Sequence, residues 1–239
     1  MKVALCLSGQ PRSFEKGYEY HYKNLIQHHD VDVFYHTWVE NETLLDKVHG
    51  IWNPVRISHT NTFDDKSFER YDRTTDPRFP SKNTVHMLYS VFKSLLIKKE
   101  YELEKGIEYD CVVKSRFDFA LNIVLPVDSI ETGKLYVPND LIKGNIKPNG
   151  LACNDQFAFG DSVTMDLYGM TFLNIRRAYD MCFPVSGEDM LSANLQINGL
   201  IQDKLSYIDM NNVFPPGKYN STPHCLIRDD FSDWNKLRG

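Results

Sequence analysis

Residues 2–38, KVALCLSGQPRSFEKGYEYHYKNLIQHHDVDVFYHTW, contain two apolar runs separated by a segment with helical spacing. The first run, Lys2 to Leu7, stops at a Ser-Gly-Gln-Pro turn, which is typical of a buried strand. The segment from Phe14 to His28 is compatible with a helix. The run from Val31 to Trp38 is rich in β-branched and aromatic residues, as strands are. Strand, helix and strand in this order predict a βαβ unit with parallel strands.

The rest of the chain adds further predicted helices and strands. Apolar residues at helical spacing from Val85 to Leu96 predict the most regular helix, and residues 109–114 (YDCVVK) predict a third buried strand. The remaining predicted elements are short strands at 135–138 and 157–159, helices at 162–179 and 188–200, and loops at 61–80 and from residue 215 onward. We expect the 61–80 loop to close over a ligand, because long loops in compact domains often act as lids.

Composition excludes several classes of protein. The 239 residues are 42% hydrophobic and 25% charged, which is typical of one globular domain. The net charge is −5, with Lys and Arg scattered along the chain, so we expect no nucleic-acid partner. The five cysteines form no CxxC pair, as is usual for reduced thiols. No apolar run approaches the roughly 20 residues of a membrane span and no secretory signal is evident, so we expect a cytoplasmic protein. The sequence indicates no particular oligomeric state.

Polar residues follow the first two predicted strands at the points where these strands end. Ser8, Gly9 and Arg12 follow the first strand, and His36 and Trp38 end the second. Ligands of open α/β sheets bind at the carboxyl ends of strands, where a Gly-containing turn presents backbone N–H groups to phosphate. Arg12 would add a bidentate cation for a diphosphate, while His36 and Trp38 would stack on, or hydrogen-bond to, a base or sugar. A plain turn with a solvated Arg12 is the alternative interpretation.

A second charged group, Lys114, Arg116 and Asp118, follows the third predicted strand. Such charges are costly to bury unless they are paired or bound to a ligand. Asp118 is a candidate ligand for a divalent metal and Arg116 a candidate phosphate ligand; an internal ion pair between these two residues is the alternative. The D-x-D sequence at residues 30–32 lies at the start of the second strand, away from this edge, and we interpret it as a solvated strand entry.

Carboxylates in the second half of the chain supply the catalytic candidates. Asp155 lies in a polar triplet before a short predicted strand, where a carboxylate would hold sugar hydroxyls, or simply form a turn. Glu188 and Asp189 begin a predicted helix, and Asp189 fits a capping box with Ser186. Acids in a first turn also complement the helix dipole, so the structural interpretation is strong here. Glu188 remains a candidate general base for an acceptor hydroxyl.

Taken together, the segments LCLSGQPRSF, DVFYHTW, YDCVVKSRFDF and NDQFAFG resemble the short GT-A-type glycosyltransferases encoded in polysaccharide gene clusters and by large DNA viruses. The resemblance covers about residues 1–200. It implies an α/β fold with a GT-A-like, Rossmann-type, mostly parallel central sheet flanked by helices. It further implies one domain over residues 1–239, with a nucleotide-binding half in about 1–120 and an acceptor-side half in about 121–239. For a viral enzyme the expected location is the host cytoplasm.

The resemblance also implies a nucleotide-diphospho-sugar donor, a glycan acceptor, and Mn²⁺ or Mg²⁺ held by a D-x-D motif after a central strand. Residues 116–118 occupy that place and keep only the last carboxylate, Asp118. If no metal binds, then Arg12, Lys114 and Arg116 must stabilise the leaving diphosphate. Two other functions remain open. A sulfotransferase would cradle phosphate in the turn at Arg12, although the expected Lys- or Thr-rich loop is missing, and a binding module would bind a sugar or nucleotide without turnover.

Overall fold

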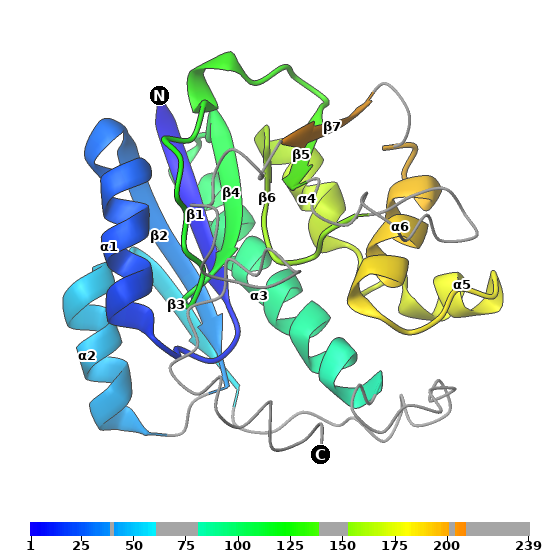
Figure 1. Cartoon of the computed structure of the whole chain (residues 1–239), viewed down its shortest axis with the longest axis horizontal. Coiled ribbons are helices and arrows are strands. Elements are labelled where there is room, and N and C mark those ends of the chain that lie inside the picture. The colour runs from blue at the N-terminus through cyan, green and yellow to red at the C-terminus, as the bar shows by residue number, and fades with distance from the viewer. Residues whose placement is uncertain (39–40, 61–80, 139–152, 201–203, 209–239) are drawn as a thin grey trace, which may run out of the picture.

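The structure, a computed structural model, describes residues 1–38, 41–60, 81–138, 153–200 and 204–208 (Figure 1). The predicted loops at 61–80 and beyond residue 215 therefore lie outside the described residues. The helices and strands, in chain order, are β1 (Lys2–Ser8), α1 (Phe14–Asn24), η1 (Ile26–His28), β2 (Asp30–Thr37), α2 (Glu42–Trp52), β3 (Arg56–His59), α3 (Ser81–Lys105), β4 (Cys111–Arg116), η3 (Val127–Ser129), β5 (Leu135–Pro138), β6 (Ala158–Gly160), α4 (Ser162–Gly169), α5 (Ile175–Asp180), α6 (Gly187–Ile197) and β7 (Leu205–Ile208).

The strands form one seven-stranded sheet in the order β3-β2-β1-β4-β6-β5-β7. Strands β3, β2, β1 and β4 are parallel to one another, β6 is antiparallel to both β4 and β5, and β5 is parallel to β7. The parallel part comes from the first half of the chain and the mixed part from the second. The predicted α/β architecture with a mostly parallel sheet is confirmed.

Strand β1 is buried on both faces, which explains its continuous apolar sequence. Its odd-numbered residues 3–7 pack in one core with Trp52 of α2, whereas Ala4 and Cys6 pack in another core with Leu95 of α3. Figure 1 shows α1 and α2 together on one side of the sheet and α3 on the other. Cys6 is a free, fully buried cysteine and acts as a small hydrophobic residue of the core.

Several predicted boundaries were wrong. Helix α1 ends at Asn24, because Leu25 departs from helical geometry with φ −143°, while the Asn24 side chain donates to the carbonyl of Leu121 at 2.5 Å. The predicted 162–179 helix is two helices, α4 and α5. Asn194 of α6 donates to the carbonyl of Leu167 at 2.9 Å and so satisfies an acceptor where α4 ends. Elements α2, β3 and β7 were not predicted.

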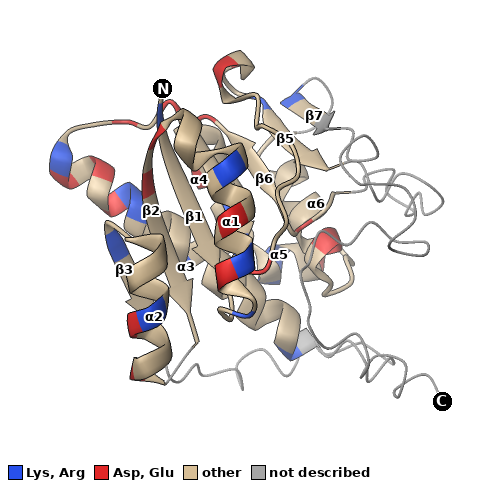
Figure 2. Ribbon diagram, turned by 60° about the vertical axis from the view of Figure 1, so that its left-hand side comes forward, with Lys and Arg blue, Asp and Glu red and all other residues tan. Residues whose placement is uncertain are grey.

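Charged residues lie mainly on the helices and at the ends of strands (Figure 2). At the amino ends of β1 and β2, the Lys2 ammonium is 3.6 Å from Asp30 and 3.3 Å from Asp32. The Tyr109 hydroxyl donates to Asp32 at 2.6 Å. Residues 30–32 are thus placed at the strand entry, as predicted, where Asp32 is held by these two partners. None of the described helices is long and apolar enough to cross a membrane.

Candidate functional site

The carboxyl ends of three parallel strands meet at one edge of the sheet. In the strand register, Ser8 of β1 is opposite both His36 of β2 and Arg116 of β4. A cavity of about 910 Å³ opens at this edge, with further walls from the start of α3, the loop before β6 and the start of α6. The predicted site residues that line it are Ser8, Gly9, Arg12, Trp38, Lys114, Arg116, Asp155 and Glu188. A second cavity, of about 630 Å³, lies near Tyr109 and contains no predicted site residue.

The turn after β1 differs from the expected phosphate loop. Gly9 has φ +102°, a conformation that favours glycine. Its backbone N–H lies 3.2 Å from the carbonyl of His36 and 2.9 Å from the Ser90 hydroxyl of α3. This N–H therefore holds the turn against β2 and α3. Gln10 and Arg12 line the cavity beside Ser8 and Gly9, and Arg12 is exposed.

His36 does not line the cavity but supports a residue that does. Its Nδ1 lies 2.8 Å from the Ser90 hydroxyl and its Nε2 lies 3.0 Å from the Thr60 hydroxyl. Burial lowers the pKa of His36 to about 3, so the ring is neutral. The ring meets Trp38 edge-on at 5.1 Å, and Trp38 stacks on His86 of α3 at 4.9 Å and 22°. Trp38 and His86 together form an aromatic wall of the cavity.

Lys114 is a buried lysine at the floor of the cavity, with 1% of its surface exposed. Its ammonium donates to the backbone carbonyls of Asp155 and Gln156, the latter at 3.0 Å. Burial lowers the pKa of Lys114 to about 7, against the opposing effect of the nearby Asp155 carboxylate. An ammonium has three N–H donors. Two carbonyl bonds leave one donor for a ligand in the cavity.

Arg116 and Asp118 form a bidentate ion pair. Arg116 donates to the two carboxylate oxygens of Asp118 at 2.8 and 2.9 Å. Asp118 is 1% exposed, and it is not among the described residues that line the cavity, whereas Arg116 is. Burial acts to lower the pKa of Arg116, but the bond to Asp118 raises it. This internal ion pair is the alternative interpretation given above for Arg116 and Asp118. It fixes the Arg116 guanidinium at the cavity wall.

The described residues do not fit the Mn²⁺ or Mg²⁺ that the resemblance implies. Among the described residues, no group of three or more His, Cys, Asp or Glu side chains converges as metal ligands. Both oxygens of Asp118 already accept from Arg116, and a metal would have to break this buried pair. The described residues therefore do not form a ready cation site, and Asp118 as a metal ligand stays a prediction.

Two of the three catalytic candidates face the cavity. A Cβ atom at Gly187 would lie only 1.8 Å from Asp155 Oδ2, so glycine lets this carboxylate lie against the first turn of α6. The positive end of the helix dipole favours a negative charge there. Glu188 lines the cavity beside it. Asp189 is buried instead: the Ser186 hydroxyl donates to its carboxylate at 2.5 Å and accepts from its N–H at 3.2 Å, which confirms the predicted cap.

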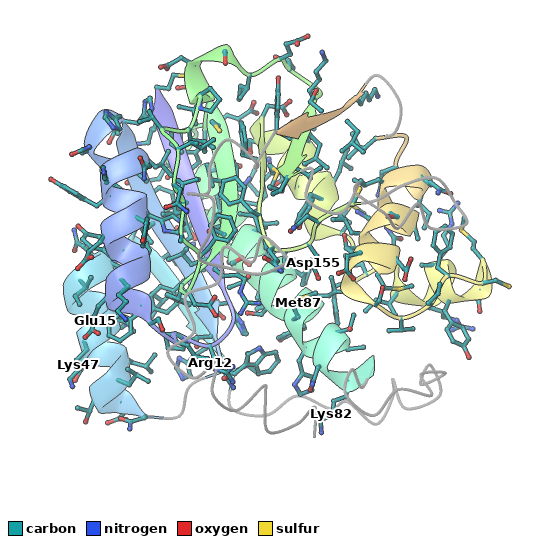
Figure 3. All side chains as sticks on the ribbon, viewed as in Figure 1. Arg12, Glu15, Lys47, Lys82, Met87 and Asp155 are labelled. Atoms are coloured by element: carbon teal, nitrogen blue, oxygen red, sulfur yellow. The ribbon has the colours of Figure 1, made fainter. Side chains whose placement is uncertain are left out.

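Sequence reasoning missed the contribution of α3. Asn83, Thr84, His86 and Met87 from its first turns line the cavity. Figure 3 shows Met87 beside Asp155, and the Met87 methyl would lie 2.8 Å from a Cβ at Gly187. The signal was connectivity, because a helix that follows a parallel strand begins at the carboxyl edge of the sheet. The predicted strand that ends at Trp38 comes before this helix, so the sequence does contain this signal.

Comparison with known proteins establishes the fold. No protein-family model and no curated protein matches the chain. The crystal structure of an active-site mutant of LgtC is similar at 13% identity and a TM-score of 0.51, over 93% of this chain and 80% of that chain. The apo-form glycosyltransferase GlyE of Streptococcus pneumoniae TIGR4 is similar at 10% identity and a TM-score of 0.43, over 87% of this chain and 45% of that chain. The similarity to LgtC confirms the predicted GT-A-like fold class.

Proposed function

We propose that this protein transfers a sugar from a nucleotide-diphospho-sugar donor to a hydroxyl of a glycan acceptor. The main support for the proposal is that cations and carboxylates line the same cavity. The cations Arg12, Lys114 and Arg116 line it from the ends of β1 and β4, and the carboxylates Asp155 and Glu188 line it from the side of α6. A diphosphate leaving group needs the first set, and an acceptor hydroxyl that loses its proton needs the second.

The size and lining of the cavity suit such a donor. Its volume of about 910 Å³ is at the upper end of the range typical of small-molecule sites, which run to roughly 1,000 Å³. The stacked rings of Trp38 and His86 offer an apolar face to a base or a sugar ring. The GT-A-like fold shared with LgtC adds support for glycosyl transfer as the class of reaction.

The reaction follows from these positions. The acceptor oxygen forms a bond to C1 of the sugar while the bond from C1 to the diphosphate oxygen breaks. The electron pair of that bond stays on the diphosphate, which leaves with one more negative charge beside Arg12 and Lys114. We assign Glu188 as the base that takes the acceptor proton, and Asp155 as the carboxylate that orients the acceptor.

The first test is binding and turnover with a panel of sugar nucleotides. UDP-, GDP-, dTDP- and CMP-sugars are compared by thermal shift, because a ligand of the folded state raises the melting temperature. Release of free nucleotide is then followed for any ligand that binds, with candidate glycan acceptors. We expect one donor class to bind and to be turned over. Binding without turnover with any acceptor would favour the non-catalytic module, and no binding to any of them would reject the proposal.

The role of Glu188 has its own matched pair of variants. Glu188→Gln keeps the shape of the side chain but removes the base, so we expect the nucleotide release rate to fall by about 100-fold or more with donor affinity little changed. Glu15→Gln on α1 is the control, since Glu15 is exposed and lies outside the cavity (Figure 3). Equal release rates for Glu188→Gln and the unmodified protein would exclude Glu188 as the base.

A further inference from the structure

We propose that Arg12, Lys114 and Arg116 hold the donor diphosphate in place of a divalent cation, so that sugar-nucleotide binding and transfer require neither Mn²⁺ nor Mg²⁺. The inference rests on the proposed function and specifies how its leaving group is stabilised. The residues at 116–118 do not fit the cation that the resemblance implies there.

The first step concerns Asp118, the one carboxylate left in that place. Its side chain is 1% exposed and accepts both hydrogen bonds from Arg116. A metal coordinated by the Asp118 carboxylate would leave the guanidinium of the partly buried Arg116 without its counter-charge. Breaking a buried ion pair in this way is strongly destabilising. Asp118 therefore acts as the residue that orients Arg116 toward the cavity.

Arg116 and Lys114 keep N–H donors beyond those that bind protein atoms. A guanidinium carries five N–H donors and an ammonium three. Two donors of Arg116 bind Asp118, and two donors of Lys114 bind the carbonyls of Asp155 and Gln156. Both cations line the cavity with donors to spare, and they are held before any ligand arrives. Preorganised donors of this kind stabilise developing charge without reorganising during the reaction.

The charges of the three cations favour a diphosphate over a divalent cation. Arg12 lines the same cavity from the turn after β1, so the diphosphate is approached by cations from two adjacent strands. A divalent cation bound beside Arg12, Lys114 and Arg116 would be repelled by their charges, which opposes its binding there. A diphosphate meets opposite charges and planar donors that suit phosphate oxygens.

The test uses inorganic pyrophosphate. This ligand reports on the diphosphate subsite without requiring the identity of the donor's base and sugar. Its binding to the full chain is measured by calorimetry in excess EDTA and again in excess Mn²⁺. We expect binding in EDTA with an affinity within about threefold of that in Mn²⁺. Binding that appears only with Mn²⁺ would overturn the proposal.

Charge-removing variants assign the contacts. In EDTA we expect Arg12→Gln and Arg116→Gln each to weaken pyrophosphate binding by about tenfold or more. Lys47→Gln is the control, because Lys47 is exposed on α2, outside the cavity; Figure 3 shows it on the outer side of that helix. Arg12 is exposed, so its variant remains informative even if Arg116→Gln fails to fold. Unchanged binding in Arg12→Gln and in a folded Arg116→Gln would refute the assignment.

Turnover separates this inference from the proposed function. Sugar transfer that stops in EDTA and returns with Mn²⁺ would overturn the inference and leave the transferase standing. Pyrophosphate binding in EDTA without turnover of any sugar nucleotide would support the anion subsite and count against the transferase. Transfer that continues in EDTA, and that falls in Arg12→Gln but not in Lys47→Gln, would support both.

Discussion

At the scale of single residues, Lys114 has an unusual position for a lysine. It lies within the buried run of β4, it is 1% exposed, and its ammonium donates to two backbone carbonyls. Long charged side chains are seldom fully buried unless they are paired or bound. Burial brings the pKa of Lys114 down to about 7, so its charge changes within the physiological range and responds to a bound anion.

This position predicts a pH dependence of anion binding. A bound pyrophosphate favours the ammonium, so it raises the pKa of Lys114 above its free value of about 7. Binding therefore takes up protons between the free and the bound pKa, and affinity should fall as the pH rises from about 7 to about 9. The groups facing Lys114 are Asp155, which raises its pKa, Arg116, which lowers it, and Asp118, which raises it.

Calorimetry in two buffers of different ionisation enthalpy measures the proton uptake directly. The dependence should be smaller in Lys114→Met, provided that this variant still shows cooperative unfolding. An affinity that stays constant from about pH 7 to about pH 9, corrected for the ionisation of pyrophosphate itself, would contradict the prediction.

At the scale of secondary structure, the docking of α1 fixes the loop that carries the Arg116–Asp118 pair. A Cβ at Gly17 would lie 1.8 Å from the carbonyl oxygen of Phe117, the residue between them. On the next turn, His21 Nε2 lies 2.9 Å from the Ser115 hydroxyl. Helix α1 thus packs directly against the backbone that follows β4.

We therefore expect Gly17→Ala to push α1 away from this loop. The clash is with backbone, which yields little, so the free energy of unfolding should fall by roughly 1–3 kcal/mol or more. Pyrophosphate binding should weaken as Arg116 moves. Gly50→Ala on α2 is the matched control, because a Cβ there meets no described atom within 4 Å and alanine should stabilise the helix by about 0.5–1 kcal/mol. Similar urea denaturation curves for the two variants would contradict this account.

The same elements show how far the sequence leads. Strands β1 and β2 and helix α3 were predicted because their apolar patterns are long and regular, and all three position the cavity. The patterns predicted His36 and Asp189 as site residues, and in the structure neither is among the described residues that line the cavity. The His36 ring is hydrogen-bonded to Ser90 and Thr60, which lie far from it in sequence, and it packs against Trp38. A capping contact with Ser186 turns Asp189 inward. The approach of Gly17 to Phe117 joins residues far apart in sequence, so no local pattern reveals it.

At the scale of the whole molecule, α3 connects the cavity with the core behind the sheet. Its first turns line the cavity, and further along the helix the Lys98 ammonium is fully buried. That ammonium donates to Glu102 at 3.1 Å, to Ser162 at 2.8 Å and to Asp166 at 2.6 Å. The last two partners belong to α4, which packs next to β6. This buried network ties α3 to the half of the sheet that supplies Asp155.

Lys98 and its neighbour Lys99 provide a direct comparison of a buried with an exposed charge. Lys99 lies 3.4 Å from Glu102 and 3.1 Å from Asp166, the same two acids, but its side chain is 37% exposed. Lys98→Met leaves the buried Glu102 and the partly exposed Asp166 without their buried partner, so we expect the free energy of unfolding to fall by about 3–5 kcal/mol. Lys99→Met removes a screened contact and should cost less than about 1 kcal/mol. Both are measured by urea denaturation. If the two variants lose similar small amounts, the network does not join α3 to α4, and the placement of the cavity walls must depend on apolar packing alone.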